Sequence, residues 1–340
     1  MISSSSPTQH NPNSGDGRFN RTRRTAGVAC CVSGRDSYQL CDYFYLQAVS
    51  GLQFAMMGTS GDIPEIVDDG LTIPEVGSWA ENKYRQITLY DELFSKGMKN
   101  KWDQRVYIDL YAGAGYSRIK GTQTPVKGSP LIALSVTTPF DKYVFCEEDK
   151  EKFTALRKRV AAIAPSASVA FVEGKCDECV DEILRAVPQG SASNKVLSLC
   201  LVDPYDFGFK FATISKLSQR FVDFLILLAV EMDANRNYEH YVWHGNTKID
   251  DALGNREWRE RWKKSGLHRG RFPHFLAEEF SRSMTTLGYL ERKAYDMKLV
   301  KLHGNNRGLY YLALFSRNPT AYGFWKDVLK YGTDQRKLWD

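Results

Sequence analysis

The sequence predicts an α/β fold in which a doubly wound, mostly parallel sheet ends in an antiparallel hairpin. Short apolar runs alternate with patterns of helical period through the middle of the chain. Several of these runs are apolar throughout, as expected of parallel strands whose two faces are both covered. Near the C-terminus, two further strand-like runs flank the turn sequence HGNNRG, which predicts the hairpin.

Composition indicates a soluble protein with a substantial core. The 340 residues are 43% hydrophobic and 25% charged, and this length allows one large domain or two smaller ones. No apolar run is long enough to cross a bilayer, and the N-terminus lacks the apolar segment of a secretory signal. The seven cysteines, an odd number, do not suggest a disulfide framework. We therefore expect a cytoplasmic protein.

The N-terminal part of the chain differs from the rest. Residues 1–76 begin with a stretch rich in Ser, Asn, Pro and Gly, and we expect them to be disordered or extended. Cys30, Cys31 and Cys41 lie there without a second Cys or His pair at ligand spacing, so we predict no metal site. The folded domain is predicted over residues 77–340.

The predicted domain begins with a helix, in which Ser78 caps the N-terminus and Glu81 completes a capping box. A strand at 106–110 follows and runs into a glycine turn. The next helix has Ser129 at its cap and Pro130 in its first turn. The alternation continues with strands at 142–149, 168–174, 196–205 and 222–232 and with helices at 150–163, 179–187 and 212–220.

The last third of the chain breaks this alternation. Residues 238–272 are charged and helical in pattern, which predicts an insertion between the last parallel strand and the rest of the sheet. A helix at 275–289 follows the insertion. The hairpin strands are predicted at 294–302 and 309–317, and a helix at 320–332 ends the fold.

Acidic residues recur at the predicted strand ends. Ligands bind open parallel sheets at the carboxyl ends of the strands, near the point where the strand order reverses. Asp109 ends the first strand and Glu147 the second, while Asp177 and Asp203 follow the third and fourth. Each acid alone could cap a helix. Together they predict a ligand site at this edge of the sheet.

The turn after the first strand contains Ala112, Gly113 and Gly115, and glycine there lets a ligand approach the backbone closely. The chain lacks the Gly-Lys-Ser/Thr of a phosphate-binding loop, and no G-x-G-x-x-G opens a helix directly. Glu147 also lies 32 residues after Gly115, rather than the ~20 expected for a dinucleotide site. A glycine turn with an acid that accepts hydrogen bonds from ribose hydroxyls favours S-adenosylmethionine.

Seven stretches carry a resemblance to a known family: SWAENK, YIDLYAGAGYSRIKG, GSPLIAL, YVFCEED, LVDPYDFG, MDANRN and YYLALFSRNPTAYGFWKDVLKYG. With these stretches in order over about residues 77–340, the chain resembles the three-Cys-motif partner proteins. The resemblance implies a Rossmann-like fold of the class I S-adenosylmethionine-dependent methyltransferases. It also implies association with a radical-SAM-like protein that carries three cysteines.

Carried over by position, the resemblance implies a set of cofactor-binding residues. Asp109, Gly113 and Gly115 match the cofactor turn, and Glu147 matches the acid that binds the ribose. Asp177 stands where such folds place an acid near the adenine amine, although it lies in EGKCDE where Gly-Asp is more usual.

Asp203, Pro204 and Tyr205 resemble the Asp-Pro-Pro-Tyr signature of amino-methyltransferases, with one proline missing. In that signature the carboxylate and a backbone carbonyl accept the two protons of an amine, and the aromatic ring stacks on a base. We therefore predict these residues to be catalytic, acting on an exocyclic amine of a nucleic-acid base. The alternative is a non-catalytic partner or scaffold for the three-Cys-motif protein, with Asp203 capping the strand end.

Two further features each allow two interpretations. Trp79 and Lys83 either close over the cofactor site or only pack in the domain. Residues 256–307 contain thirteen Lys or Arg against six Asp or Glu. This segment is either a solvated helical face of mixed sign or a surface that binds the phosphates of a nucleic acid. The second interpretation takes support from four aromatic residues nearby, which are Trp258, Trp262, Phe272 and Tyr289.

Overall fold

The computed structural model describes residues 69–122, 125–243, 245–301 and 308–334. Contacts divide the chain into Met1–Met57 and Gly58–Asp340, and every described residue belongs to the second unit. The expectation for most of residues 1–76, and for Cys30, Cys31 and Cys41, therefore lies outside the described residues. No helix in the described ranges is long and apolar enough to cross a membrane.

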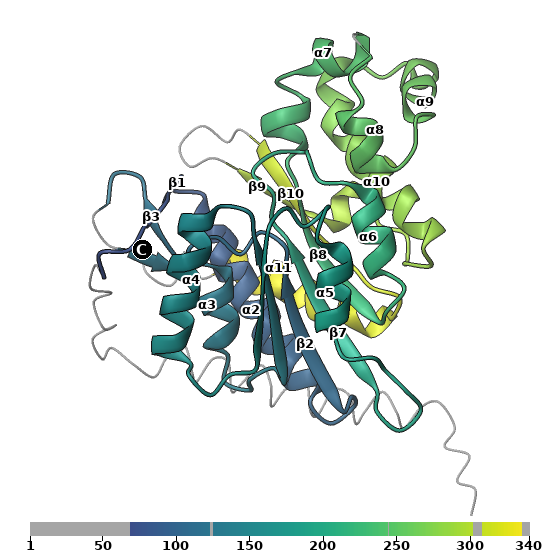
Figure 1. Cartoon of the computed structure of the whole chain (residues 1–340). Coiled ribbons are helices and arrows are strands. Elements are labelled where there is room, and N and C mark those ends of the chain that lie inside the picture. The colour runs from purple at the N-terminus through teal and green to yellow at the C-terminus, as the bar shows by residue number, and fades with distance from the viewer. Residues whose placement is uncertain (1–68, 123–124, 244, 302–307, 335–340) are drawn as a thin grey trace, which may run out of the picture. The chain divides into compact units, whose positions relative to one another are not determined.

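The main sheet has seven strands among the described residues, and it confirms the predicted α/β class (Figure 1). Its parallel strands are β2 (Gln104–Asp109), β5 (Lys142–Glu147), β6 (Val169–Glu173), β7 (Val196–Val202) and β8 (Val222–Leu228). The predicted hairpin consists of β9 (Lys298–Lys301) and β10 (Gly308–Phe315), and β10 also pairs antiparallel with β8. The strand order is β6-β5-β2-β7-β8-β10-β9.

This order places a switch point in the middle of the sheet. From β2 the chain moves outward through β5 to β6, and it then returns to add β7 and β8 on the other side. The carboxyl ends of β2 and β7 therefore meet where the connections run in opposite directions. Open α/β sheets bind their ligands at such a point.

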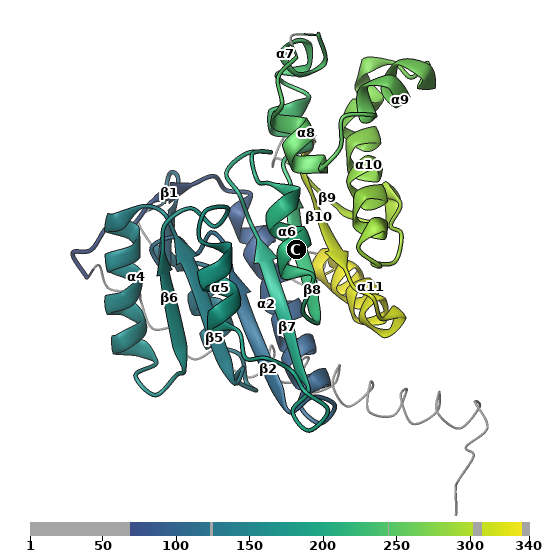
Figure 2. The same cartoon turned by 45° about the vertical axis from the view of Figure 1, so that its right-hand side comes forward.

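Helices cover both faces of the sheet (Figure 2). One face packs against α2 (Ala80–Met98), α3 (Ser129–Leu134), α4 (Lys150–Ile163) and α11 (Pro319–Asp334). The other packs against α5 (Val180–Ala186), α6 (Phe211–Leu217) and α10 (Phe272–Thr286). Residues of β2 alternate between these faces: Val106 and Ile108 belong to the core under α5, α6 and α10, whereas Tyr107 contacts the ring of Phe140.

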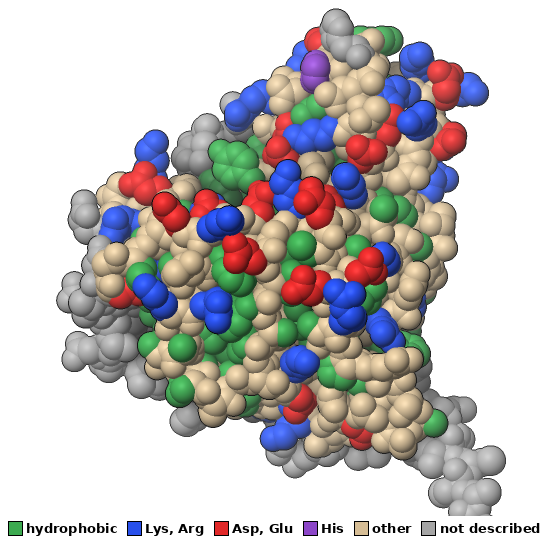
Figure 3. Space-filling model, in the orientation of Figure 1, with side chains coloured by type: hydrophobic (Ala, Val, Ile, Leu, Met, Phe, Trp, Pro, Cys, Tyr) green, Lys and Arg blue, Asp and Glu red, His purple; other side chains and the backbone are tan. Residues whose placement is uncertain are grey.

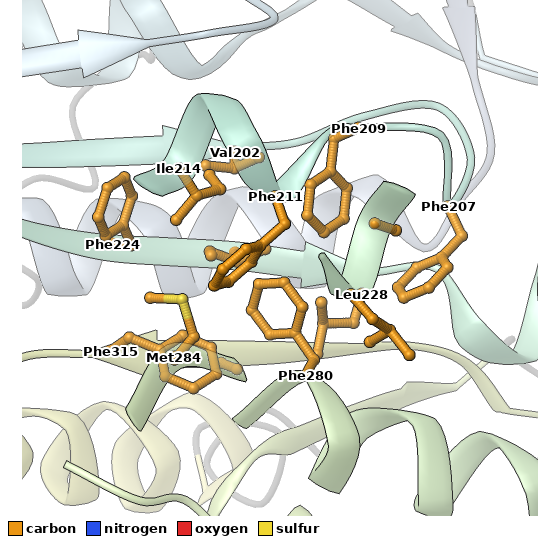
Figure 4. Packing of buried hydrophobic residues seen from close by; sticks show 14 of the residues in the cluster. Val202, Phe207, Phe209, Phe211, Ile214, Phe224, Leu228, Phe280, Met284 and Phe315 are labelled. Atoms are coloured by element: carbon orange, nitrogen blue, oxygen red, sulfur yellow. The ribbon is translucent and has the colours of Figure 1, made fainter. Parts of the chain in front are cut away.

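Aromatic side chains fill the space between the sheet, α6 and α10 (Figure 4). The ring of Phe280 on α10 lies edge to face with that of Phe209, 5.5 Å between centroids, and with that of Phe315, 5.4 Å away. Phe211 contacts the same ring. All of these rings are buried. The burial of their apolar surface therefore holds α10 on the sheet, and each ring pair adds about 0.5–1.5 kcal/mol.

Between β8 and α10 the chain forms α7 (Tyr238–Trp243), α8 (Lys248–Leu253), α9 (Trp258–Ser265) and a 3₁₀ turn at Arg269–Arg271. Trp258 and Trp262 pack on Phe272, with 5.0 Å between the Trp262 and Phe272 ring centroids. These three rings and that of Tyr289 are buried. The suggestion that they support a phosphate-binding surface is therefore wrong, because the rings form the core that holds the helices together.

Several caps and boundaries of the predicted elements differ in the structure. The N-cap of α2 is Trp79 and no side chain caps the helix, so the box of Ser78 and Glu81 is wrong; the carbonyls of Gly77 and Ser78 accept the first amides. The helix at 129 is capped by Gly128 instead of Ser129. The predicted strand 222–232 ends at Leu228, and Val230–Ala234 forms a π-helical turn.

The chain after the glycine turn forms a second, three-stranded sheet, although the sequence analysis predicts no strand there. Its strands are β1 (Glu75–Val76), β3 (Tyr116–Ile119) and β4 (Pro125–Lys127), in the order β1-β3-β4. β3 pairs antiparallel with β4 and parallel with β1. The segment before α2 is thereby attached to the chain that leaves the glycine turn.

Candidate functional site

The glycine turn follows the carboxyl end of β2. Gly113 and Gly115 have φ angles of +65° and +88°, in the left-handed region that favours glycine. A Cβ on Gly115 would lie 3.3 Å from the side chains of Leu131 and Leu156, so packing also restricts this position. A Cβ on Gly113 would meet nothing within 4 Å. Gly113 thus leaves bare backbone facing open space, where a ligand can approach it.

Glu147, the last residue of β5, contacts this turn directly. Its Oε2 accepts a hydrogen bond from the Gly113 amide at 2.7 Å, and its Oε1 accepts one from the Asp149 amide at 2.9 Å. The Ala112 amide donates to the Cys146 carbonyl at 2.9 Å. The structure therefore brings together the turn and the acid that the sequence analysis singled out. Binding of ribose by Glu147 stays a prediction.

Asp109 lies buried beneath the turn. Its Oδ1 accepts a hydrogen bond from the Tyr111 amide at 3.1 Å, while Oδ2 has no hydrogen-bond partner among the described residues. Burial raises the pKa of this carboxyl to about 7, although hydrogen bonds from the Ser129 side chain and the Tyr111 amide act in the opposite direction. Near neutral pH the protonated and ionised forms of this carboxyl are therefore both populated.

Asp203, directly after β7, forms a buried ion pair that the sequence analysis missed. Its Oδ2 lies 2.5 Å from Nζ of Lys83 on α2, and only 13% and 5% of the two side chains are exposed. Nζ also lies 5.0 Å from the ring centroid of Trp79 and 4.8 Å from that of Tyr84. The sequence signal was the SWAENK stretch, but pattern alone does not show a contact between residues so far apart.

The ion pair also favours the charged form of Lys83. Burial lowers the pKa of its ammonium, but the attraction of Asp203 and Tyr84 outweighs burial and raises it above 10.5. The carboxylate of Asp109 is close enough to act in the same direction. Lys83, Asp203 and Asp109 therefore form one charged cluster at the switch point.

Within the predicted catalytic triplet, the side chains point to different environments. Asp203 faces Lys83 and Pro204 is buried, whereas Tyr205 is 92% exposed. The triplet thus presents a carboxylate inside the domain and an aromatic ring to solvent.

A second charged network holds the loop after β7. Nζ of Lys248 on α8 lies 2.8 Å from Oδ2 of Asp206 and 2.8 Å from Oδ2 of Asp233. Asp233 also accepts hydrogen bonds from the Phe207 amide and the Tyr241 hydroxyl. Burial opposes ionisation of Asp233, but the hydrogen bond from Lys248 and those from its other partners lower its pKa. The MDANRN stretch is therefore a clamp that joins this loop to the helical insertion.

Asp177 lies apart from these contacts. Its Oδ1 accepts a hydrogen bond from the Thr213 hydroxyl on α6, and it is close enough to Tyr111 to act on the pKa of that phenol. Burial is the main cause of the raised pKa of Tyr111. Contact of Asp177 with an adenine amine stays a prediction.

Arg159 of α4 links the glycine turn to the segment before α2. Its Nη1 donates to the carbonyl of Ala114 at 2.6 Å and to that of Thr72 at 3.0 Å. Its Nη2 lies 2.7 Å from Asp69 Oδ1. The guanidinium is almost fully buried, so it fixes the backbone of the turn from behind.

Most cations of the basic segment are paired with carboxylates in the part of the chain that the structure describes. Arg261 lies 2.6 Å from Glu279, and Arg259 pairs with Asp250. The same holds for Arg256, Lys263, Arg269, Arg282, Arg292 and Lys293. Figure 3 shows charges of both signs interspersed over this face. Most cations of this segment therefore already have a carboxylate partner within the protein.

No protein-family model matches the sequence, and no curated protein matches it either. Among solved structures the chain is similar to Trm1 from Pyrococcus horikoshii in complex with S-adenosyl-L-methionine, at 6% identity and a TM-score of 0.39. That match covers 74% of this chain and 61% of Trm1, so the chain spans less than two thirds of that protein.

The chain is also similar to TYW2 from M. jannaschii in complex with AdoMet, at 10% identity and a TM-score of 0.29, over 67% of this chain and 77% of TYW2. A putative S-adenosyl-L-methionine-dependent methyltransferase from Methanococcus maripaludis matches at 12% identity and a TM-score of 0.32, over 71% and 90% of the two chains. At these scores, the fold class rests on the strand order and connections of the sheet.

Proposed function

We propose that this chain binds S-adenosylmethionine at the carboxyl ends of β2 and β5 and transfers its methyl group to an amine. The observation that carries the proposal is the meeting of Glu147 with the backbone of Gly113 at the switch point, 2.7 Å apart. The open space beside Gly113 accommodates a ligand close to the backbone, and the buried Asp109 carboxyl has an unused oxygen nearby. These residues therefore fit a polar nucleoside ligand.

In this proposal each group of the site has a separate task. S-adenosylmethionine supplies an activated methyl group when bound. Glu147 accepts hydrogen bonds from ribose hydroxyls, exchanging its contact with the Gly113 amide for them. Asp203 accepts hydrogen bonds from the acceptor amine and so directs the nitrogen lone pair away from itself. The amine loses one proton for each methyl group that it gains.

For the acceptor we propose an exocyclic amine of a nucleic-acid base. The support is the position of Tyr205 two residues after Asp203, with 92% of its side chain exposed. An exposed ring can stack on a base, an interaction worth ~1–3 kcal/mol in proteins that bind single strands. Asp203→Asn should abolish methyl transfer to DNA or RNA in an assay with tritiated cofactor. Transfer that survives this change would rule out the assigned role of Asp203.

Cofactor binding is tested by calorimetry with S-adenosylhomocysteine. We expect binding by the wild type and its loss in a folded double variant, Gly113→Val with Glu147→Ala. The matched control is Gly121→Val with Glu148→Ala. Gly121 also has a positive φ with open space around its Cβ position, and Glu148 is exposed beside Glu147. Absence of binding by the wild type, or equal binding by the two double variants, would overturn the proposal.

One observation favours a second function. Lys83 forms an ion pair with the carboxylate of Asp203. This is expected if the position for a methyl acceptor is closed and the fold serves as a scaffold. We propose that such a scaffold binds the radical-SAM-like three-Cys-motif protein, which the sequence resemblance implies. Co-expression of the two proteins followed by pull-down tests this function. Recovery of a complex with no methyl transfer would favour the scaffold over the enzyme.

A further inference from the structure

An amine already lies where the proposed function places the methyl acceptor. Nζ of Lys83 is 2.5 Å from Oδ2 of Asp203, the carboxylate assigned to the acceptor amine. Two rings flank this nitrogen, with centroids 5.0 Å and 4.8 Å away. Asp109, beneath the glycine turn, is near enough to influence the same ammonium. The lysine is thus paired with the proposed acceptor carboxylate and lies near Asp109, the acid beneath the glycine turn.

We propose that Lys83 is a self-methylation site, where the chain transfers a methyl group to its own Nζ. This inference rests on the proposed function and names an acceptor for the same site. Only 5% of the Lys83 side chain is exposed, so another enzyme cannot enclose it in the folded protein. A methyl donor for Lys83 must therefore reach Nζ from within this domain.

The transfer balances with the groups at hand. Lys83 gives one proton to Asp203, whose oxygen already accepts its hydrogen bond, and from there the proton passes to solvent. The nitrogen lone pair forms a bond to the methyl carbon while the carbon–sulfur bond breaks. The electron pair of that bond stays on sulfur, and S-adenosylhomocysteine leaves. The product is monomethyl-lysine.

The surroundings suit the product as well as the substrate. The methylated nitrogen keeps two hydrogens and its positive charge, so the ion pair with Asp203 persists. Aromatic rings attract methylated ammonium groups through the negative face of the ring. Trp79 and Tyr84 lie at distances within the ~6 Å over which this attraction acts.

The test uses the full chain and peptide mass spectrometry. The protein is incubated with S-adenosylmethionine that carries a trideuteromethyl group, and it is cleaved with chymotrypsin because methylation blocks trypsin. We expect one trideuteromethyl group on Lys83, or one ordinary methyl group there in the protein as purified. The matched controls are Lys96, which is exposed on the same helix, and Lys248, which is ion-paired with Asp206 and Asp233 instead of Asp203.

Two variants and one binding measurement separate the outcomes. Lys83→Arg should remove the label and keep S-adenosylhomocysteine binding, and Asp203→Asn should lower labelling of Lys83 by at least about tenfold, a loss of ~1.4 kcal/mol or more. Binding of S-adenosylhomocysteine with no methyl group on Lys83 would overturn this inference alone. Absence of binding would overturn it together with the proposed function. Equal labelling of Lys96 and Lys248 would show unspecific chemistry and also overturn it.

Discussion

Asp109, a residue of the proposed binding site, destabilises the folded protein when its carboxyl is ionised. The side chain is fully buried, one oxygen lacks a hydrogen-bond partner among the described residues, and burial raises its pKa from 3.8 to about 7. Between these values the folded chain holds a proton that the unfolded chain releases. The contribution of this carboxyl to the free energy of unfolding is therefore fully present below pH 3.8. It is lost as the pH rises toward 7.

The first prediction follows from that sign. Asp109→Asn keeps the shape of the side chain and removes its ionisation, so it should stabilise the ligand-free protein above pH 7. The difference between a pKa of 3.8 and one of about 7 corresponds to an upper limit of roughly 4 kcal/mol. Urea unfolding at pH 4 and pH 8 measures this, and the gain should nearly vanish at pH 4. A gain that does not depend on pH would contradict the assigned protonation.

At the scale of elements, α10 and α8 attach the helical insertion by different means. α10 uses apolar packing, with Phe280 between the rings of Phe209 and Phe315. α8 uses charge, through the contacts of Lys248 with Asp206 and Asp233. The two attachments should therefore respond differently to substitution.

The second prediction concerns the apolar attachment. Phe280→Ala removes a fully buried ring and leaves a cavity, so the free energy of unfolding should fall by about 3–5 kcal/mol. Chemical denaturation measures the loss. Phe280→Leu is the milder comparison and should retain more than half of the wild-type free energy of unfolding. A loss below ~1 kcal/mol in the alanine variant would show that the site collapses around the cavity.

The third prediction concerns the charged attachment. Lys248→Met keeps the length of the side chain but leaves Asp206 and Asp233 without its ammonium. The free energy of unfolding should fall by about 1–3 kcal/mol, the cost of leaving a buried polar group without its partner. Hydrogen exchange should accelerate over residues 203–210, which the clamp holds. Lys216→Met, at an exposed ion pair on α6, is the control and should leave that exchange unchanged.

Prediction from sequence succeeded for features that the residues of a single helix or strand determine. Apolar runs defined the strands of the sheet, and position at a strand end brought Glu147 together with Gly113. It failed where partners are distant in sequence. The contacts of Lys83 with Asp203 and of Lys248 with Asp233 arise only when the sheet is assembled. The capping box failed because backbone carbonyls satisfied the first amides of α2 instead of a side chain.

At the scale of the whole molecule, the net charge does not tell how many cations are free to bind phosphates. The chain carries +6, but Arg259 is tied to Asp250 and to the Asn246 carbonyl, so reversing its charge would damage the insertion itself. Lys264 and Arg271 are exposed, and no ion pair involves them in the described ranges. Affinity for phosphates depends on such cations and falls with salt.

The fourth prediction uses this distinction. Lys264→Glu with Arg271→Glu should weaken binding of a fluorescent single-stranded DNA or RNA and reduce its salt dependence, without lowering the melting temperature. Fluorescence anisotropy across a range of salt concentrations measures both. Lys96→Glu with Lys99→Glu, at the far end of α2, is the control pair. Equal effects from the two pairs would mean that binding follows net charge and has no defined surface.

The contacts of Arg159 determine at which residue a stable fragment of this domain can begin. A fragment that starts at residue 77, just before α2, loses both Thr72 and Asp69, yet it keeps the buried guanidinium that they accompany. Removing the partner of a buried charge costs far more than removing an exposed loop. The same guanidinium holds the Ala114 carbonyl, so the damage would reach the glycine turn. Recombinant fragments, fusions and permuted versions should therefore retain residue 69 onward, even though α2, the first helix among the described residues, begins eleven residues later.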